Sequence, residues 1–210
     1  MCRGFVLASF FFTLLAFANA VHAQEGFSAD VVELKRSGTP VVAKMYYAQE
    51  RMRIEPQNMT PRNAPPIAFI LYLKTQTEYM MLLRDRVYSQ IPPAGDWQMY
   101  TSFRSGDVDD ACSIWDKASP SHSGACSKVG DDTINGRAAV KYEGRCSKGQ
   151  PCYIWIDRQL RLLVKWEDGP NGRELRNIQE GNLLPDLFEI PRGFKRVQAT
   201  TGTMQSAPLR

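Results

Sequence analysis

The chain has 210 residues, of which 43% are hydrophobic and 23% are charged, and its formal net charge at pH 7 is +4. This length fits one sizeable domain rather than two. The 26 basic residues are scattered, so the sequence lacks the concentrated basic footprint of a nucleic-acid-binding protein, and that class is excluded.

The first 23 residues have the features of a secretory signal peptide. Arg3 supplies the positive charge, residues 5–17 form an apolar run of the usual length, and small residues follow up to Ala23, after which we expect cleavage. An uncleaved anchor is the alternative, although the run is short for one. Cys2 precedes the apolar run, so the sequence has no lipobox. We therefore expect a periplasmic or secreted protein with no transmembrane segment after signal cleavage.

Short alternating segments separated by turn residues dominate the next part of the chain and are typical of an antiparallel sheet. In one of them, Met52 and Ile54 point to one side of the predicted strand, and the charged residues that alternate with them point to the other. The same pattern predicts strands over residues 27–35, 41–48, 51–55, 67–74, 77–83 and 86–91.

Residues 92–130 interrupt this rhythm with glycine and proline, so we expect an insertion between strands. Residues 107–117 within it are predicted to form a short helix, with Ser105 or Asp107 as the N-cap. The helix carries Trp115, and an amphipathic helix in this place would cover the apolar face of a sheet as a lid. A helix packed permanently on the sheet is the alternative.

Four cysteines follow the leader, namely Cys112, Cys126, Cys146 and Cys152. An even number in an exported chain predicts two disulfides. Pairing Cys112 with Cys126 and Cys146 with Cys152 closes the shortest loops and is the pairing we expect, although spacing alone leaves two others open. The gaps between the cysteines do not suit zinc, so no metal site is expected.

The strand pattern resumes around Asn135 and Gly136, which form a strong signal for a tight turn. Further strands are predicted over residues 137–143, 152–157, 161–167 and 173–180, followed by a closing apolar piece at 187–190 and a flexible tail at 199–210. A sheet of about ten strands with one helix must curl to hide its apolar face. We predict a mainly β fold, an antiparallel meander curled into a half-barrel with the helical insertion as lid. A β-sandwich is the alternative.

The order of these elements resembles the LolA-like superfamily of periplasmic outer-membrane lipoprotein carriers and their uncharacterised relatives. The resemblance covers nearly the whole mature chain, so residues 24–198 are expected to form a single LolA-like β domain. The segments that carry it are residues 27–32, 51–55, 79–83, 86–92, 134–142, 154–157 and 187–194.

This resemblance implies a half-open barrel whose hydrophobic concave face shelters acyl chains under a helical lid. It also implies that an arginine early in the sheet makes the lid contact, and Arg53, followed by Arg51, matches that position best. The sequence departs from the carriers because it lacks their initial helix and the aromatic-rich segment after the arginine. Any lid must therefore come from residues 92–130.

The apolar side of the predicted sheet and its insertion carry large, adaptable side chains, which suit a cavity that holds an acyl chain by burying its surface. The alternative is that they fill a closed core. Arg51 and Arg53 alternate with buried residues, so the pattern alone places them on the outer face. The candidates for the cavity lining are Met45, Tyr47, Met52, Ile54, Phe69, Leu71, Tyr79, Met81, Leu83, Trp97, Trp115 and Trp166.

No catalytic residue stands out. His122 lies among serines but without the strained elbow that positions a nucleophile, and Asp107, Asp109 and Asp110 lack the pattern of a calcium loop. We expect no cofactor and no enzymatic activity, although a pair of carboxylates on neighbouring strands cannot be recognised from the sequence. The sequence predicts a binding or carrier protein whose partner is a lipid or an acylated protein. The alternative is an envelope interaction or sensor module with a filled core and a protein partner.

Overall fold

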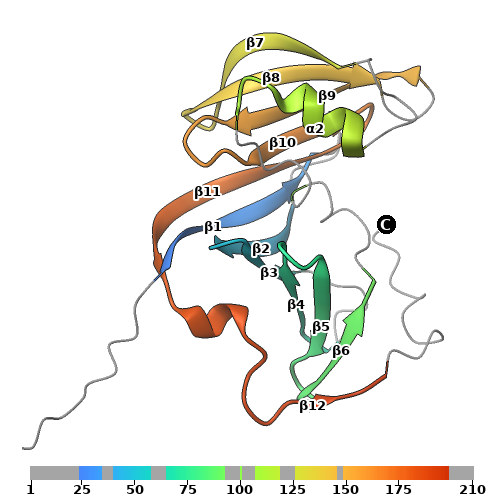
Figure 1. Ribbon diagram of the computed structural model, residues 1–210, viewed down its shortest axis with the longest axis vertical. Helices are drawn as coiled ribbons and strands as arrows, with labels where there is room; N and C mark the ends of the chain where they lie inside the picture. The colour runs from blue at the N-terminus through green and yellow to red at the C-terminus, as the bar shows by residue number, and fades with distance from the viewer. Residues whose placement is uncertain are drawn as a thin grey trace, which may run out of the picture.

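One twelve-stranded sheet dominates the computed structural model, in the order β12-β6-β5-β4-β3-β2-β1-β11-β10-β9-β8-β7. Neighbouring strands run antiparallel, except that β12 runs parallel to β6. The sheet curls without closing, and β12 and β7 form its edges (Figure 1), which confirms the predicted mainly β half-barrel. The structure describes residues 24–34, 40–57, 65–92, 100, 107–118, 126–145 and 149–198.

Two meanders make up all of this sheet except β12. The first comprises β1 (Gln24–Glu33), β2 (Val41–Ala48), β3 (Arg51–Pro56), β4 (Ile67–Tyr72), β5 (Thr77–Leu82) and β6 (Val87–Ile91). The second comprises β7 (Ser127–Ile134), β8 (Arg137–Arg145), β9 (Pro151–Asp157), β10 (Leu163–Asp168) and β11 (Asn171–Leu183). The ten predicted strands are all present and differ from the prediction only at their ends. The leader and the tail at 199–210 lie outside the described residues.

The chain passes from the first meander to the second across the full width of the sheet. β6 lies next to one edge and β7 forms the other, so the connection between Ile91 and Ser127 spans all the strands between them. Helix α2 (Ala111–Ala118) lies in this connection. The second meander then returns toward the first, because β11 pairs with β1. This route carries α2 over the sheet, where it packs against the second meander (Figure 1).

The predicted helix starts too early. α2 begins at Ala111, because residues 107–110 form a turn in which Asp107 Oδ1 accepts a hydrogen bond from the N–H of Asp109 at 2.9 Å. Asp107 therefore caps this turn rather than the helix. Strand β7 is the element that the sequence pattern misses at this point, and it shortens the expected insertion at residues 92–130.

The C-terminal part of the chain also differs from the prediction. The apolar piece at 187–190 is partly a 3₁₀ helix, η3 (Pro185–Phe188), in which proline occupies the first turn. β12 (Lys195–Arg196) follows and adds to the edge of β6. Phe188 is completely buried, so this segment is part of the fold rather than a loose end.

Candidate functional site

The two faces of the sheet differ in what covers them. We call the face that packs against α2 the inner face and the opposite one the outer face. The strand register places one continuous apolar surface on the inner face, because Met45 pairs with Ile54 and Ile54 with Phe69. Seven of the predicted cavity residues share this inner face: Met45, Tyr47, Met52, Ile54, Phe69, Leu71 and Trp166.

Three predicted cavity residues lie elsewhere. Tyr79 pairs with Ile70 across β4 and β5, and this row belongs to the outer face, where Met81 and Leu83 also pack. The reason is that Glu78, not Tyr79, points to the inner face, where it pairs with Leu71. Trp97, a fourth candidate, lies outside the described residues.

The central part of the inner face is filled by the protein itself. Met45, Met52 and Ile54 are each 0% exposed, and they belong to the same buried cluster as Trp115 of α2. This agrees with the alternative that these side chains form a core. Three pockets lined by described residues lie at the margins of the sheet and offer space for a ligand.

One of these pockets opens on the inner face at the start of β1. It has a volume of about 630 Å³, and we call it the inner-face pocket. Its apolar part consists of the stacked rings of Phe27 and Tyr47, whose centroids lie 5.5 Å apart, together with Leu160 from the turn between β9 and β10. Its complete lining is Glu25, Gly26, Phe27, Tyr47, Gln159, Leu160, Glu180, Gly181 and Asn182.

Small residues allow the strands to approach one another beside this pocket. Gly26 lies between Ala48 of β2 and Gly181 of β11 in the strand register. A Cβ at Gly26 would overlap the carbonyl oxygen of Tyr47, so only glycine fits there. The close approach holds Tyr47 beside Phe27 and so shapes the apolar part of the pocket.

A buried carboxylate holds the opposite wall in place. Asp157 is 1% exposed and accepts hydrogen bonds at 2.8 Å from the backbone N–H groups of Gln159 and Leu160. It also accepts one from Nε of Arg137 at 2.5 Å, which, with the neighbouring Glu180, raises the pKa of Arg137. Arg137 Nη1 lies 2.7 Å from Glu180 Oε1, so one arginine connects the turn to β11. The wall is therefore preorganised.

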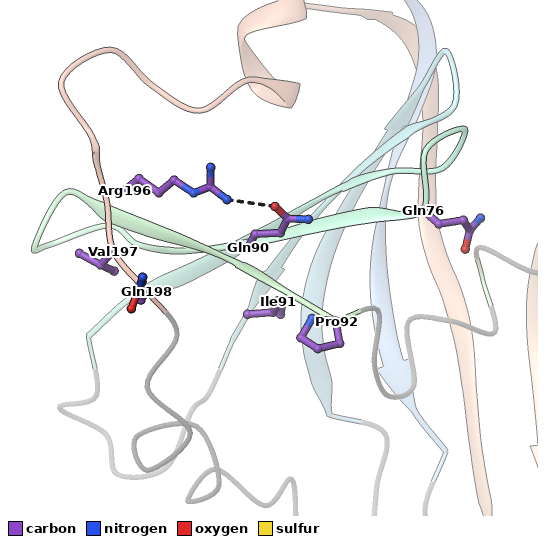
Figure 2. A pocket seen from close by; sticks show the side chains of 7 residues that line it. All are labelled: Gln76, Gln90, Ile91, Pro92, Arg196, Val197 and Gln198. Carbon is purple, nitrogen blue, oxygen red and sulfur yellow. Dashed lines mark hydrogen bonds between the residues drawn. The ribbon is translucent and has the colours of Figure 1, made fainter.

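The other two pockets involve the C-terminal segment. The edge pocket, of about 700 Å³, lies where β6 ends, and Arg196 donates a hydrogen bond at 3.1 Å to Gln90 beside it (Figure 2). The outer pocket, of about 600 Å³, lies between Tyr72, Tyr79 and the segment after η3. Both differ from the inner-face pocket, because neither contains a residue from the buried cluster under α2.

Helix α2 is held firmly on the second meander. Trp115 is 4% exposed and packs on Gly144 of β8, where any side chain would collide with its indole ring. The hydroxyl of Tyr142 donates a hydrogen bond at 2.6 Å to the carbonyl of Val108, and burial raises the pKa of Tyr142. These contacts give Trp115 the role of a core residue.

The two arginines predicted to hold the lid contact a different segment. Arg53 Nη1 donates a hydrogen bond at 3.1 Å to the carbonyl of Leu187, and its Nε donates one at 2.7 Å to Glu55. Arg51 lies 3.9 Å from the carboxylate of Glu189. Both arginines therefore contact the segment around η3 on the outer face. The alternation in β3 predicts that they lie on this face.

The disulfide between Cys112 and Cys126 is present, as predicted. It joins α2 to the residue that precedes β7, and its Cα atoms lie 5.4 Å apart. Cys152 is also disulfide-bonded. The predicted partner, Cys146, lies outside the described residues, so that pairing stays a prediction.

Sequence reasoning misses most of the inner-face pocket. It finds Tyr47, but not Phe27, Leu160 or Glu180. Phe27 and Glu180 meet only because β11 pairs with β1, and Leu160 comes from the turn between β9 and β10. Among the described residues, no group of three or more His, Cys, Asp and Glu is arranged to hold a metal ion. In the same part of the chain, no helix has the length and apolar character needed to cross a bilayer.

The chain matches no protein-family model and no curated protein sequence. It is similar to the structure of an uncharacterized conserved protein from Thermus thermophilus, with a TM-score of 0.49, 12% identity, and coverage of 83% of this chain and 91% of that one. A chain of the Pseudomonas aeruginosa MucA/MucB complex gives a TM-score of 0.45 and 12% identity, over 80% of this chain and 56% of that chain, so the match spans little more than half its length. LprF from Mycobacterium bovis gives a TM-score of 0.34 and 17% identity, over 78% and 89%. These values assign no family, and the resemblance to the LolA-like superfamily stays an expectation.

Proposed function

We propose that the protein is a periplasmic or secreted binding protein that holds the acyl chain of a lipid or of a lipidated protein. The observation that carries this proposal is the inner-face pocket, which combines the stacked rings of Phe27 and Tyr47 and the side chain of Leu160 with a polar rim. Pockets of several hundred cubic ångströms with an apolar wall and a few polar groups are typical sites for small ligands.

The physical basis of such binding is the burial of methylene groups. Each methylene removed from water contributes about 0.8 kcal/mol, so a short stretch of an acyl chain against Tyr47 and Leu160 supplies most of the affinity. Preorganisation adds to this, because the bonds of Asp157 to the turn fix Leu160 before a ligand arrives. The filled centre beneath α2 limits the ligand to the margin of the inner face.

An oxidising compartment fits this proposal. The disulfide between Cys112 and Cys126 is of the kind that persists in exported proteins and is rare in the cytosol. Lipids and lipidated proteins that cross an aqueous envelope compartment need a protein that shields their acyl chains, because exposing these chains to water is costly.

The proposal is tested by direct detection of a bound lipid. Native mass spectrometry of the protein exported by its own host is expected to show the additional mass of a bound lipid. Extraction with organic solvent is expected to remove this lipid. In titrations with monopalmitoylglycerol, Leu160→Asn is expected to weaken binding about tenfold or more, because the apolar wall is lost. Leu184→Asn is the matched control, since Leu184 is 59% exposed and lies outside the pocket. A single apo mass in repeated preparations, together with no uptake of monopalmitoylglycerol, would rule the proposal out.

A second candidate is an envelope interaction module that uses the margin of the sheet to bind a protein. The completely buried side chains of Met45, Met52 and Ile54 favour it, because a filled centre leaves no deep cavity for cargo. A photo-crosslinking residue at Gln90, beside the edge pocket, is expected to capture a specific protein in cells if this candidate holds. Failure to capture any protein, with lipid present in the purified chain, would leave the carrier as the better account.

A further inference from the structure

The charged groups that line the inner-face pocket are all acidic. Glu25 and Glu180 carry its charge, and Gln159 and Asn182 add neutral amide groups. Among the described residues that line the pocket, there is no lysine, arginine or histidine. The side chains at the opening of the pocket therefore present carboxylates and amides, but no cationic side chain, to the polar end of a ligand.

Both carboxylate oxygens of Glu180 are already engaged. Oε1 lies 2.7 Å from Arg137 Nη1, and Oε2 accepts a hydrogen bond at 2.6 Å from Nε2 of Gln159. Arg137 cannot serve a ligand, because it also holds Asp157 through Nε and Nη2. One positive charge thus faces two negative ones within this network. Glu25 adds a further negative charge, so these side chains together are net negative.

We infer that the pocket selects acyl ligands whose polar end carries no negative charge, such as a glycerol monoester or an N-acylated peptide, and rejects fatty-acid carboxylates and anionic phospholipids. This inference rests on the proposed function, since it names the class of ligand for the same pocket. An anionic group at the opening would lose water and gain no cationic side chain in return. A hydroxyl or an amide finds a donor and an acceptor in the side chain of Asn182.

The test compares two ligands that share one acyl chain. Monopalmitoylglycerol and palmitate are titrated into the full-length mature protein by calorimetry at pH 8 and low salt, with both below their aggregation concentrations. Monopalmitoylglycerol is expected to bind about tenfold tighter or better. Raising the salt concentration is expected to narrow the difference by improving the binding of palmitate, because salt screens repulsion between exposed charges.

Two variants locate the cause of the selectivity. Glu25→Gln removes the exposed carboxylate at the opening and is expected to narrow the difference in affinity between palmitate and the monoester. Glu143→Gln is the matched control, because Glu143 is exposed on β8 and does not line the pocket, and it is expected to keep the full difference.

Each outcome decides something. If neither ligand binds, the proposed function fails. If both ligands bind equally well to the unmodified protein, the inference fails while the proposed function stands. If the two ligands differ but Glu25→Gln leaves the difference unchanged, charge at the opening is not its cause, and the inference is likewise overturned.

Discussion

Trp115 and Gly144 fit together so closely that no side chain fits at Gly144 beneath the indole. The indole of Trp115 lies directly over the Cα of Gly144, and a Cβ on that glycine would overlap Cζ2 and Cε2 of the ring. Any larger residue at this position of β8 would therefore push α2 away from the sheet. The close packing of α2 on β8 therefore depends on the absence of a side chain at Gly144.

Gly144→Ala is accordingly expected to destabilise the protein by about 1–3 kcal/mol, because overpacking in a filled interior forces shifts of the backbone or of rotamers. Urea unfolding followed by tryptophan fluorescence measures the change. Ala138→Val is the control, since Ala138 is exposed on the same strand and tolerates the added volume. If Gly144→Ala has the same free energy of unfolding as the unmodified protein, Trp115 does not pack on the sheet in solution.

The disulfide between Cys112 and Cys126 closes a short loop around α2, with a sequence separation of 14. Replacing both cysteines by serine is expected to cost about 3 kcal/mol, the chain-entropy value for a loop of about this length. Helix α2 is expected to stay in place, because Trp115 and the hydrogen bond between Tyr142 and Val108 also hold it. Urea unfolding gives the free energy, and hydrogen exchange of α2 tests its packing. Rapid exchange throughout α2 in the double variant would mean that the disulfide alone holds the helix.

Arg53 connects β3 to η3 rather than to α2. Arg53→Ala is expected to speed hydrogen exchange in the segment around Leu187 and to cost about 1–3 kcal/mol, because a charge-assisted hydrogen bond to a carbonyl is lost. Arg51→Ala is the matched control and is expected to have a smaller effect, since its ion pair with Glu189 is long and exposed. If Arg53→Ala speeds hydrogen exchange in α2 instead, Arg53 makes the lid contact that the resemblance implies.

The turn of the hairpin between β2 and β3 consists of two non-glycine residues with positive φ. Gln49 has φ 46° and Glu50 has φ 61°, whereas Asn135 and Gly136 form the equivalent turn between β7 and β8 with the residues this turn prefers. Replacing Gln49 and Glu50 by Asn and Gly is expected to stabilise the protein by about 1 kcal/mol. Thermal unfolding measures the gain. The reverse exchange, Asn135→Gln with Gly136→Glu, should lower stability, and no change in either variant would argue against these backbone angles.

The sequence predicts a strand well where its two faces differ in chemistry. In β3, Met52 and Ile54 are buried while Arg51 and Arg53 are partly exposed, as the alternation indicates. β7 escapes the prediction because it is an edge strand in which only Ile134 is buried, so it has no alternation to detect.

Which face of the sheet a side chain joins is harder to predict than the strand itself. Tyr79 and Met81 look like inner-face residues, yet they lie on the outer face, where Ile190 and Phe194 of the C-terminal segment cover this apolar cluster. The inner-face pocket is harder still, because Phe27 and Glu180 are neighbours only through the pairing of β1 with β11. A contact between residues this far apart in the sequence leaves no local pattern.

Asp30 makes the protein sensitive to acid at one defined place. Nδ2 of Asn177 donates to its Oδ2 at 2.8 Å and Nζ of Lys44 to its Oδ1 at 3.0 Å, and these bonds, that of Asn177 first, hold the pKa of Asp30 below its usual value. Because the pKa is lower in the folded state, the stabilisation is present above about pH 4 and is lost as the pH falls through the folded pKa. Asp30→Asn is therefore expected to cost about 1–2 kcal/mol at pH 7 and less at pH 2.5, as measured by urea unfolding at both values. Equal losses at the two pH values would mean that the negative charge of Asp30 contributes nothing to the fold.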